Sequence, residues 1–119
     1  KEIRGAGGGL LYRAGVARLG ADLVLVLGLV HHLVLGEGRS IDAVFDVLGR
    51  LANRTLVLEF VALDDDKIRE DPAFFPNLKK FDTATYNLDK MLQAGRRHFS
   101  RVEHRASHPA TRTILVFDK

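Results

Sequence analysis

The stretch LVLVLGLVHHLVLGEG, residues 23–38, is an apolar run that ends at two adjacent histidines and a loop flanked by glycines. The run of Val and Leu within Ala21–Val30 shows no alternation with polar residues. That pattern is typical of a strand buried on both faces of a parallel sheet. It therefore predicts a central strand that delivers His31 and His32 to one edge of the sheet.

The residues that follow predict a strand–helix–strand unit. Ser40 suits the N-cap of a helix whose apolar positions recur at helical spacing as far as Leu51. Thr55–Leu63 is a second apolar strand, and Glu59 is its only charged residue. A strand, a helix and a strand at this spacing predict two parallel strands with a right-handed crossover helix.

The remainder of the chain predicts a hairpin behind a long helix. An acidic loop is expected to hold a short helical turn at Lys67–Glu70, and Thr83 or Thr85 could cap the helix that comes next. Ser100–Ser107 and Arg112–Lys119 are two short strand patterns with a brief connection, which favours antiparallel pairing. The predicted fold class is therefore α/β.

Length and composition limit the class of protein. The chain has 119 residues, of which 46% are hydrophobic and 28% charged, as in a soluble globular domain. It has no cysteine, which excludes disulfides and thiolate metal sites and suits a reducing, cytoplasmic setting. The apolar run Leu23–Leu35 is shorter than the roughly 20 residues that span a bilayer, so no membrane segment is expected.

Residues 1–20 are rich in glycine and predict a linker or turning segment before a domain over residues 21–119. A short helix is expected over Leu10–Leu19. The GAGGG motif, Gly5–Gly9, suggests a nucleotide-binding loop, but such a loop needs a preceding strand and a helix behind it. The residues KEIR before it are too few and too polar for that strand, so the linker interpretation is preferred.

His31 and His32 are the first candidate functional residues. Ligands of open α/β sheets bind outside the carboxyl ends of the strands, and the pair lies at such an end. Adjacent histidines on a regular backbone point in different directions, and no partner stands at a recognised ligand spacing, so no metal site is predicted. The open alternatives are a histidine beside a cofactor pocket or acting as a proton acceptor, and a histidine that only caps the strand.

Acidic residues near the second strand are the next candidates. Glu59 needs a partner or a cavity, because burying an unpaired charge is costly, and an arginine ion pair is the alternative to a functional role. Asp64, Asp65 and Asp66 resemble a Mg²⁺ site, but three consecutive acids more often form a solvated loop.

The distribution of charge gives only weak support for a nucleic-acid interface. Between Arg96 and Arg112 the chain holds five arginines and one acid, within a net charge of +3. A nucleic-acid interface normally needs a stronger basic stripe, so a solvated helix end and strand are preferred and nucleic acid is not an expected partner.

In sequence, these elements resemble the C-terminal half of a class I S-adenosylmethionine-dependent methyltransferase. In that family the fourth strand begins at an Asp and ends in a His-His-Leu motif, which matches Asp22 through Leu33. Its fifth strand matches Thr55–Leu63, and an antiparallel hairpin closes its sheet. The resemblance covers residues 21–119 and implies a partial Rossmann-like sheet.

The resemblance also implies a function and its residues. It implies methyl transfer from S-adenosylmethionine to a small-molecule acceptor. His31 or His32 would then face the acceptor as an orienting group or base, and Glu59, Asp64 and Asp65 would border its side of the site. The cofactor would lie against four consecutive residues: Gly28, Leu29, Val30 and His31.

The glycine-rich first motif of that family and its ribose-binding acid are absent from this sequence. Both belong to the N-terminal half of the fold, so that half is an expected partner and this chain alone is expected to be inactive. We also expect an exposed sheet edge that could support self-association. The alternative is a non-catalytic interaction domain that binds a protein or nucleic acid through this edge or the Arg-rich hairpin.

Overall fold

The computed structural model describes residues 16–19 and 22–119. The described strands are β1 Val16–Leu19, β2 Leu23–Val26, β3 Thr55–Val61, β4 Arg101–Ala106 and β5 Arg112–Asp118. The helices and helical turns are η1 His32–Gly36, α2 Ile41–Leu51, α3 Asp66–Glu70, η2 Pro72–Phe74, η3 Leu78–Lys80 and α4 Leu88–Arg96.

The five described strands form one mixed sheet in the order β1-β2-β3-β5-β4. β2 and β3 are parallel and α2 connects them, while β4 and β5 form an antiparallel hairpin whose second strand also pairs antiparallel with β3. The predicted α/β class, the parallel pair with its crossover helix and the terminal hairpin are therefore confirmed.

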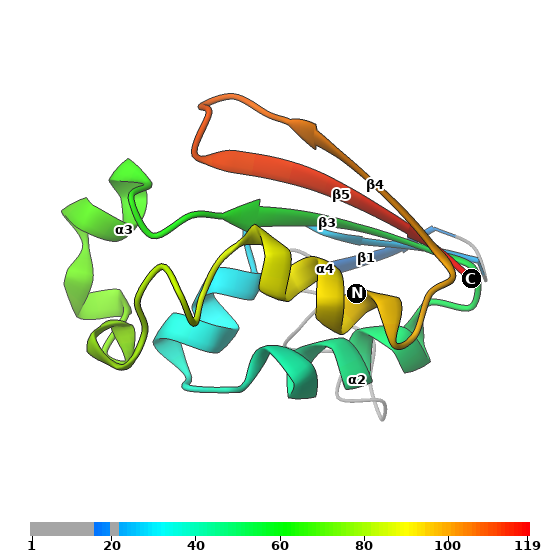
Figure 1. Cartoon of the computed structure of the whole chain (residues 1–119), viewed down its shortest axis with the longest axis horizontal. Helices are drawn as coiled ribbons and strands as arrows, with labels where there is room; N and C mark the ends of the chain where they lie inside the picture. The colour runs from blue at the N-terminus through cyan, green and yellow to red at the C-terminus, as the bar shows by residue number, and fades with distance from the viewer. Residues whose placement is uncertain (1–15, 20–21) are drawn as a thin grey trace.

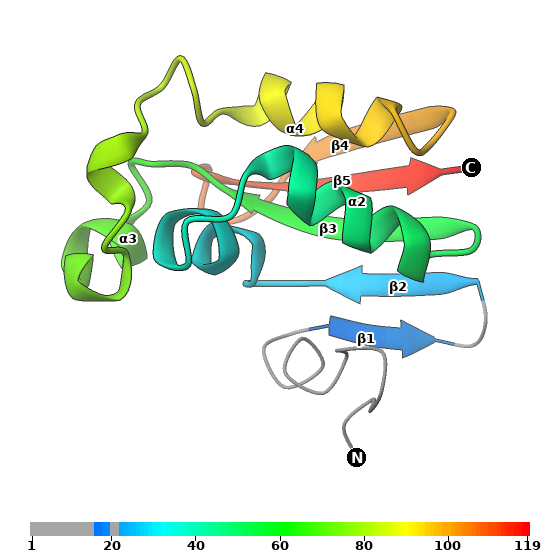
Figure 2. The same ribbon diagram turned by 90° about the horizontal axis from the view of Figure 1, so that it is seen from below.

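Both longer helices lie on the same face of the sheet. Figure 1 shows α2 and α4 below the strands, and Figure 2, seen from below, shows both helices in front of them. None of the described helices covers the opposite face, where Leu25, Val57 and Val116 are only half-buried. The structure is a sheet with one helical layer in its described part.

The core lies between the sheet and this helical layer. Val24, Leu56, Leu58 and Leu115 point into it from alternate strand positions and are almost completely buried. Phe45 of α2 contacts Phe117 of β5 edge to face, with the ring centroids 5.4 Å apart. Burial of this apolar face stabilises the fold by roughly 25 cal/mol for each Å² removed from water.

The predicted N-cap of α2 is confirmed, whereas the predicted N-cap of α4 is wrong. The Ser40 hydroxyl accepts a hydrogen bond from the Ala43 N–H, as expected for the N-cap of α2. The cap of α4 is Asn87, whose side chain accepts from the Lys90 N–H, so the predicted caps Thr83 and Thr85 were wrong. Thr85 instead bonds to Asp82 in a turn before the helix.

Two predictions near the N-terminus were wrong. Val16–Leu19 is a strand that pairs with β2, where a helix over Leu10–Leu19 was expected; the rest of that range, and Gly5–Gly9, lie outside the described residues. The central strand was expected to reach Val30, but β2 ends at Val26. Gly28 adopts a φ of 65°, a left-handed conformation that breaks an extended strand.

β1 pairs antiparallel with β2, so β2 is not an edge of the sheet. Within the described residues, β1 and β4 are the outer strands of the sheet. No helix in the same part of the chain is both long enough and apolar enough to cross a membrane.

Candidate functional site

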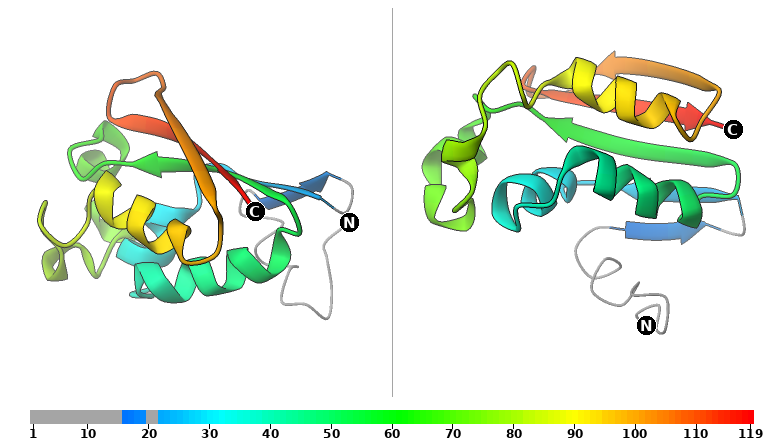
Figure 3. Two further views of the ribbon diagram at one scale, coloured as in Figure 1. Left: turned by 45° about the vertical axis from the view of Figure 1, so that its right-hand side comes forward. Right: turned by 60° about the horizontal axis from the view of Figure 1, so that its bottom comes forward.

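A cleft of about 350 Å³ opens beyond the carboxyl ends of β2 and β3. Figure 3 shows the cyan η1 turn and the green α3 segment together at this end of the sheet. The cleft is lined by Gly28, His31, His32, Lys67, Asp71, Phe74, Phe75 and Arg112. Its position is the one that open α/β sheets use for ligands.

Gly28 and Glu59 fix the exit of β2 into the cleft. The Gly28 N–H donates a hydrogen bond of 3.0 Å to Glu59 Oε1, which joins the turn after β2 to the neighbouring strand. A Cβ added at Gly28 would meet only that same oxygen, at 4.0 Å, so the space beyond the glycine is open. Glu59 therefore holds the backbone that leads to His31.

His31 occupies the wall of the cleft with most of its imidazole out of contact with solvent. The residue is 4% exposed, and its Nδ1 has no hydrogen-bond partner among the described residues. A buried polar atom without a partner costs on the order of 1–3 kcal/mol, and such atoms are uncommon in folded proteins. His31 therefore brings an unused hydrogen-bonding group to the wall of the cleft.

The surroundings of His31 keep its imidazole neutral. Burial is the largest cause, and together with the neighbouring His32 and Arg112 it lowers the pKa of His31 to about 4, against a smaller raising effect of Asp65. Since the ordinary value is near 6.5, the ring is uncharged at neutral pH and can accept a proton.

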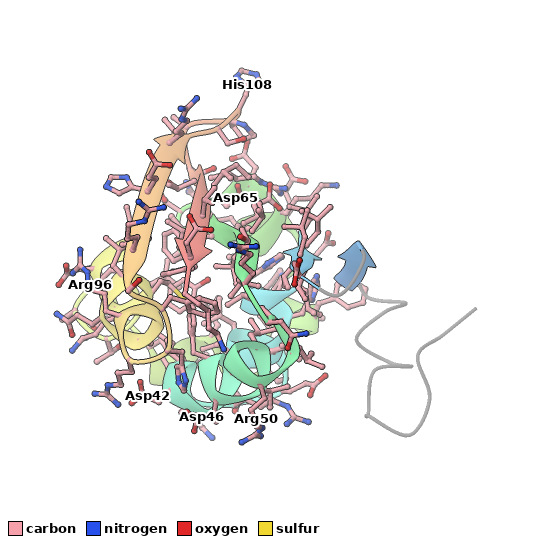
Figure 4. The ribbon with its side chains drawn as sticks, turned by 90° about the vertical axis from the view of Figure 1, so that its right-hand side faces the viewer. Asp42, Asp46, Arg50, Asp65, Arg96 and His108 are labelled. Carbon is pink, nitrogen blue, oxygen red and sulfur yellow. The ribbon has the colours of Figure 1, made fainter. Side chains whose placement is uncertain are left out.

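Asp65 and Arg112 form an ion pair at the cleft, which Arg112 lines. Arg112 Nε lies 3.1 Å from Asp65 Oδ2, and Arg112 Nη1 lies 3.7 Å from Glu59 Oε2. Thr111 and the Lys67 N–H also donate to Asp65, which caps α3. Burial alone would raise the pKa of Asp65, but the hydrogen bonds from Arg112, Thr111 and Lys67 outweigh it and lower that pKa to about 2. Asp65 is thus a structural anion at the start of α3, and it is labelled in Figure 4.

An aromatic surface forms one side of the cleft. The ring centroids of His32 and Phe75 are 5.1 Å apart in a stacked arrangement, and Phe74 beside them is 66% exposed. Asn77 holds this loop against η1, because its side chain donates to the Gly36 carbonyl and its N–H donates to that of Leu35. The loop is therefore positioned by hydrogen bonds as well as by packing.

Both histidine side chains face the cleft, although adjacent residues were expected to point in different directions. A strand would have turned adjacent side chains apart, but His31 and His32 lie where the chain enters the helical turn η1. Their ring centroids are consequently 4.3 Å apart, and both line the same cleft. The expectation that the two side chains point in different directions was therefore wrong.

The other predicted site residues are divided between the cleft, the core and the surface. Gly28 and Glu59 belong to the cleft region, but Leu29 and Val30 are buried in the core because β2 ends before them. Asp64 is exposed and borders a separate, largely apolar groove at the start of α4. The solvated-loop interpretation of the three acids fails for Asp65, which is 1% exposed.

Arg112, Lys67 and Phe75 were not predicted as site residues. Arg112 stands opposite Val61 at the carboxyl end of β3, a register that follows from the predicted hairpin only once β5 is placed against β3. The two phenylalanines between prolines in a polar loop, Phe74 and Phe75, were the available signal for an aromatic surface.

Searches for metal sites and relatives identify nothing further. The described residues contain no group of three or more His, Cys, Asp or Glu side chains that could hold a metal ion. No family model, curated protein or solved structure matches the chain.

Proposed function

We propose that the chain forms the acceptor side of an S-adenosylmethionine-dependent methyltransferase with a small-molecule substrate. The observation that carries the proposal is His31, a buried neutral imidazole with an unpartnered Nδ1 at the ligand-binding edge of a parallel strand pair. The order of the elements also supports the proposal: a parallel strand pair with a crossover helix is followed by a closing hairpin. The resemblance to the methyltransferase family implies that arrangement.

The residues fit one wall of a pocket for the methyl donor. Gly28 offers the donor open space without a side chain, while the unpartnered nitrogen of His31 is left to the acceptor. The N–H of Gly28 is bonded to Glu59, so this glycine would contribute space rather than a hydrogen bond. When bound, the donor supplies a sulfonium methyl group to a nucleophilic atom.

The residues of this chain would then have distinct tasks. His31 orients the acceptor and takes the proton that the nucleophile loses, which requires the neutral ring. Glu59 positions His31 through Gly28, and the Asp65–Arg112 pair keeps β5 against the start of α3. Phe74 and Phe75 limit the access of water to the acceptor. A cytoplasmic location is part of the proposal.

Calorimetric titration with S-adenosylhomocysteine tests the proposal. The samples are this chain and the chain extended by whatever residues its gene encodes before Lys1. We expect heat of binding from the extended chain and weak or no heat from this chain alone. No heat from the extended chain at millimolar ligand, or a gene that encodes no strand and glycine loop upstream, contradicts the proposal.

A second candidate is supported by β4. Arg101 and Arg105 on this outer strand are exposed and have no ion pair within the described residues, so the hairpin could bind an acidic partner. Retention of the protein on a polyanion column should then fall steeply with salt. A flat response contradicts binding to nucleic acid.

A further inference from the structure

The side chains around the cleft restrict the class of ligand that it can take. Its wall is built from flat rings: His31 and His32 each lie within 5.6 Å of Phe75 between ring centroids. Phe74 adds a largely exposed ring at the same cleft. Aromatic side chains pair best with another planar ring in an offset or edge arrangement, so the wall favours a planar ligand over a flexible aliphatic one.

The unpartnered Nδ1 of His31 requires a polar group on that ligand. A neutral imidazole nitrogen either donates or accepts, depending on its tautomer. A hydroxyl group can meet both cases, because it carries one donor and two acceptor lone pairs. A ligand without such a group would leave the buried nitrogen unpaired.

The charges at the cleft disfavour an anion. Glu59, Asp65 and Asp71 supply three carboxylates, against the two cations of Lys67 and Arg112. Arg112 is already paired with two of these acids, so it offers little to an additional carboxylate. An uncharged ligand avoids the repulsion.

We infer that the cleft binds an uncharged aromatic hydroxyl compound, with its ring against the exposed rings of His32 and Phe74 and its hydroxyl at His31 Nδ1. The inference rests on the proposed function, in which this compound is the methyl acceptor. It specifies a substrate class that the resemblance leaves open.

Four small probes test the inference by NMR titration of the 119-residue chain: phenol, toluene, cyclohexanol and benzoate. Phenol should shift the signals of the His31 and His32 imidazoles and of the Phe75 ring. Toluene lacks the hydroxyl, cyclohexanol lacks the flat ring, and benzoate carries a charge, so each should bind at least about fivefold more weakly. Equal or tighter binding of any of the three, or no shift with phenol, overturns the inference.

Variants separate the two contacts. His31→Phe keeps a ring and should remove the preference for phenol over toluene, whereas a change of the exposed Phe74, Phe74→Leu, should weaken phenol and toluene together. If His31→Phe loses its fold, His31→Leu, which also lacks a hydrogen-bonding group, provides the same comparison. A phenol preference that survives a folded His31 variant overturns the assignment of the hydroxyl to Nδ1.

The outcome is independent of the methyl-donor titration. Binding of phenol without binding of S-adenosylhomocysteine by the extended chain would support the ring site and contradict the methyltransferase. Binding of S-adenosylhomocysteine by the extended chain without a preference for phenol would support the methyltransferase and contradict the aromatic hydroxyl compound as its acceptor.

Discussion

His31 and His32 are neighbours in the chain, yet one imidazole is buried and the other is exposed. In the unfolded protein the ring of His31 takes a proton near its ordinary pKa of 6.5, whereas burial delays protonation in the folded protein to about pH 4. Between these values the unfolded state binds more protons, so the free energy of unfolding falls as the pH falls.

The first prediction follows from this difference. The free energy of unfolding of the wild type should drop by on the order of 3 kcal/mol between pH 6.5 and 4 because of His31. His31→Phe keeps the ring contacts but cannot titrate, so its stability should change much less in this interval. Urea unfolding at several pH values measures both proteins, and parallel pH profiles would contradict the buried neutral ring.

Asp65 and Asp64 form a matched pair for the second prediction. Asp65→Asn removes the charge that Arg112, Thr111 and Lys67 contact, and should lower the free energy of unfolding by about 3 kcal/mol. Asp64→Asn changes an exposed side chain and should stay within about 0.5 kcal/mol of the wild type. Equal losses in urea unfolding at neutral pH would show that the ion pair has no special role.

At the scale of elements, periodicity and capping chemistry determine what the sequence can predict. The helix from Ser40 to Leu51 and the strand that starts at Thr55 were predicted because a local pattern encodes each of them. The end of β2 was not, because the positive φ of Gly28 depends on its bond to Glu59, 31 residues later. The partners of Asp65 were missed for the same reason, since Arg112 is brought there by the sheet.

The third prediction concerns the contact between α4 and β5. A Cβ at Gly95 would overlap Cε1 of the buried Phe117, so Gly95→Ala should lower the melting temperature even though alanine favours helices. We expect a loss of about 2 kcal/mol. Gly49→Ala is the milder comparison, because its Cβ would lie 2.8 Å from Cγ of the half-buried His98, a smaller overlap than the one at Gly95. A smaller loss at Gly95 than at Gly49 would contradict the close packing of α4 on β5.

At the scale of the whole molecule, the sheet is asymmetric in its described part. Helices cover one face, and the charged side chains of α2 point away from it, as Asp42, Asp46 and Arg50 show in Figure 4. The sequence suggested burial on both faces because the strands are apolar throughout. The single helical layer was not predicted, since strand patterns do not say which other elements are present.

Two neighbouring positions on β3 provide the fourth prediction. Leu58 is completely buried against the helices, whereas Val57 faces the other side and is half-buried. Leu58→Lys should abolish folding, because it places an unpaired charge in the core. Val57→Lys should cost no more than about 1.5 kcal/mol. Circular dichroism melts of both variants measure these losses. Loss of folding in both would contradict a sheet face that no described helix covers.

We propose that His31 and Gly28 face the ligand of a methyltransferase-type site. The most direct measurement is an NMR map of S-adenosylhomocysteine binding on the extended chain. We expect the NMR signals of the Gly28 amide and the His31 imidazole to shift, and those of Glu103 and His104 on the outer strand β4 to stay unchanged. Shifts confined to the hairpin, or none at millimolar ligand, would contradict it.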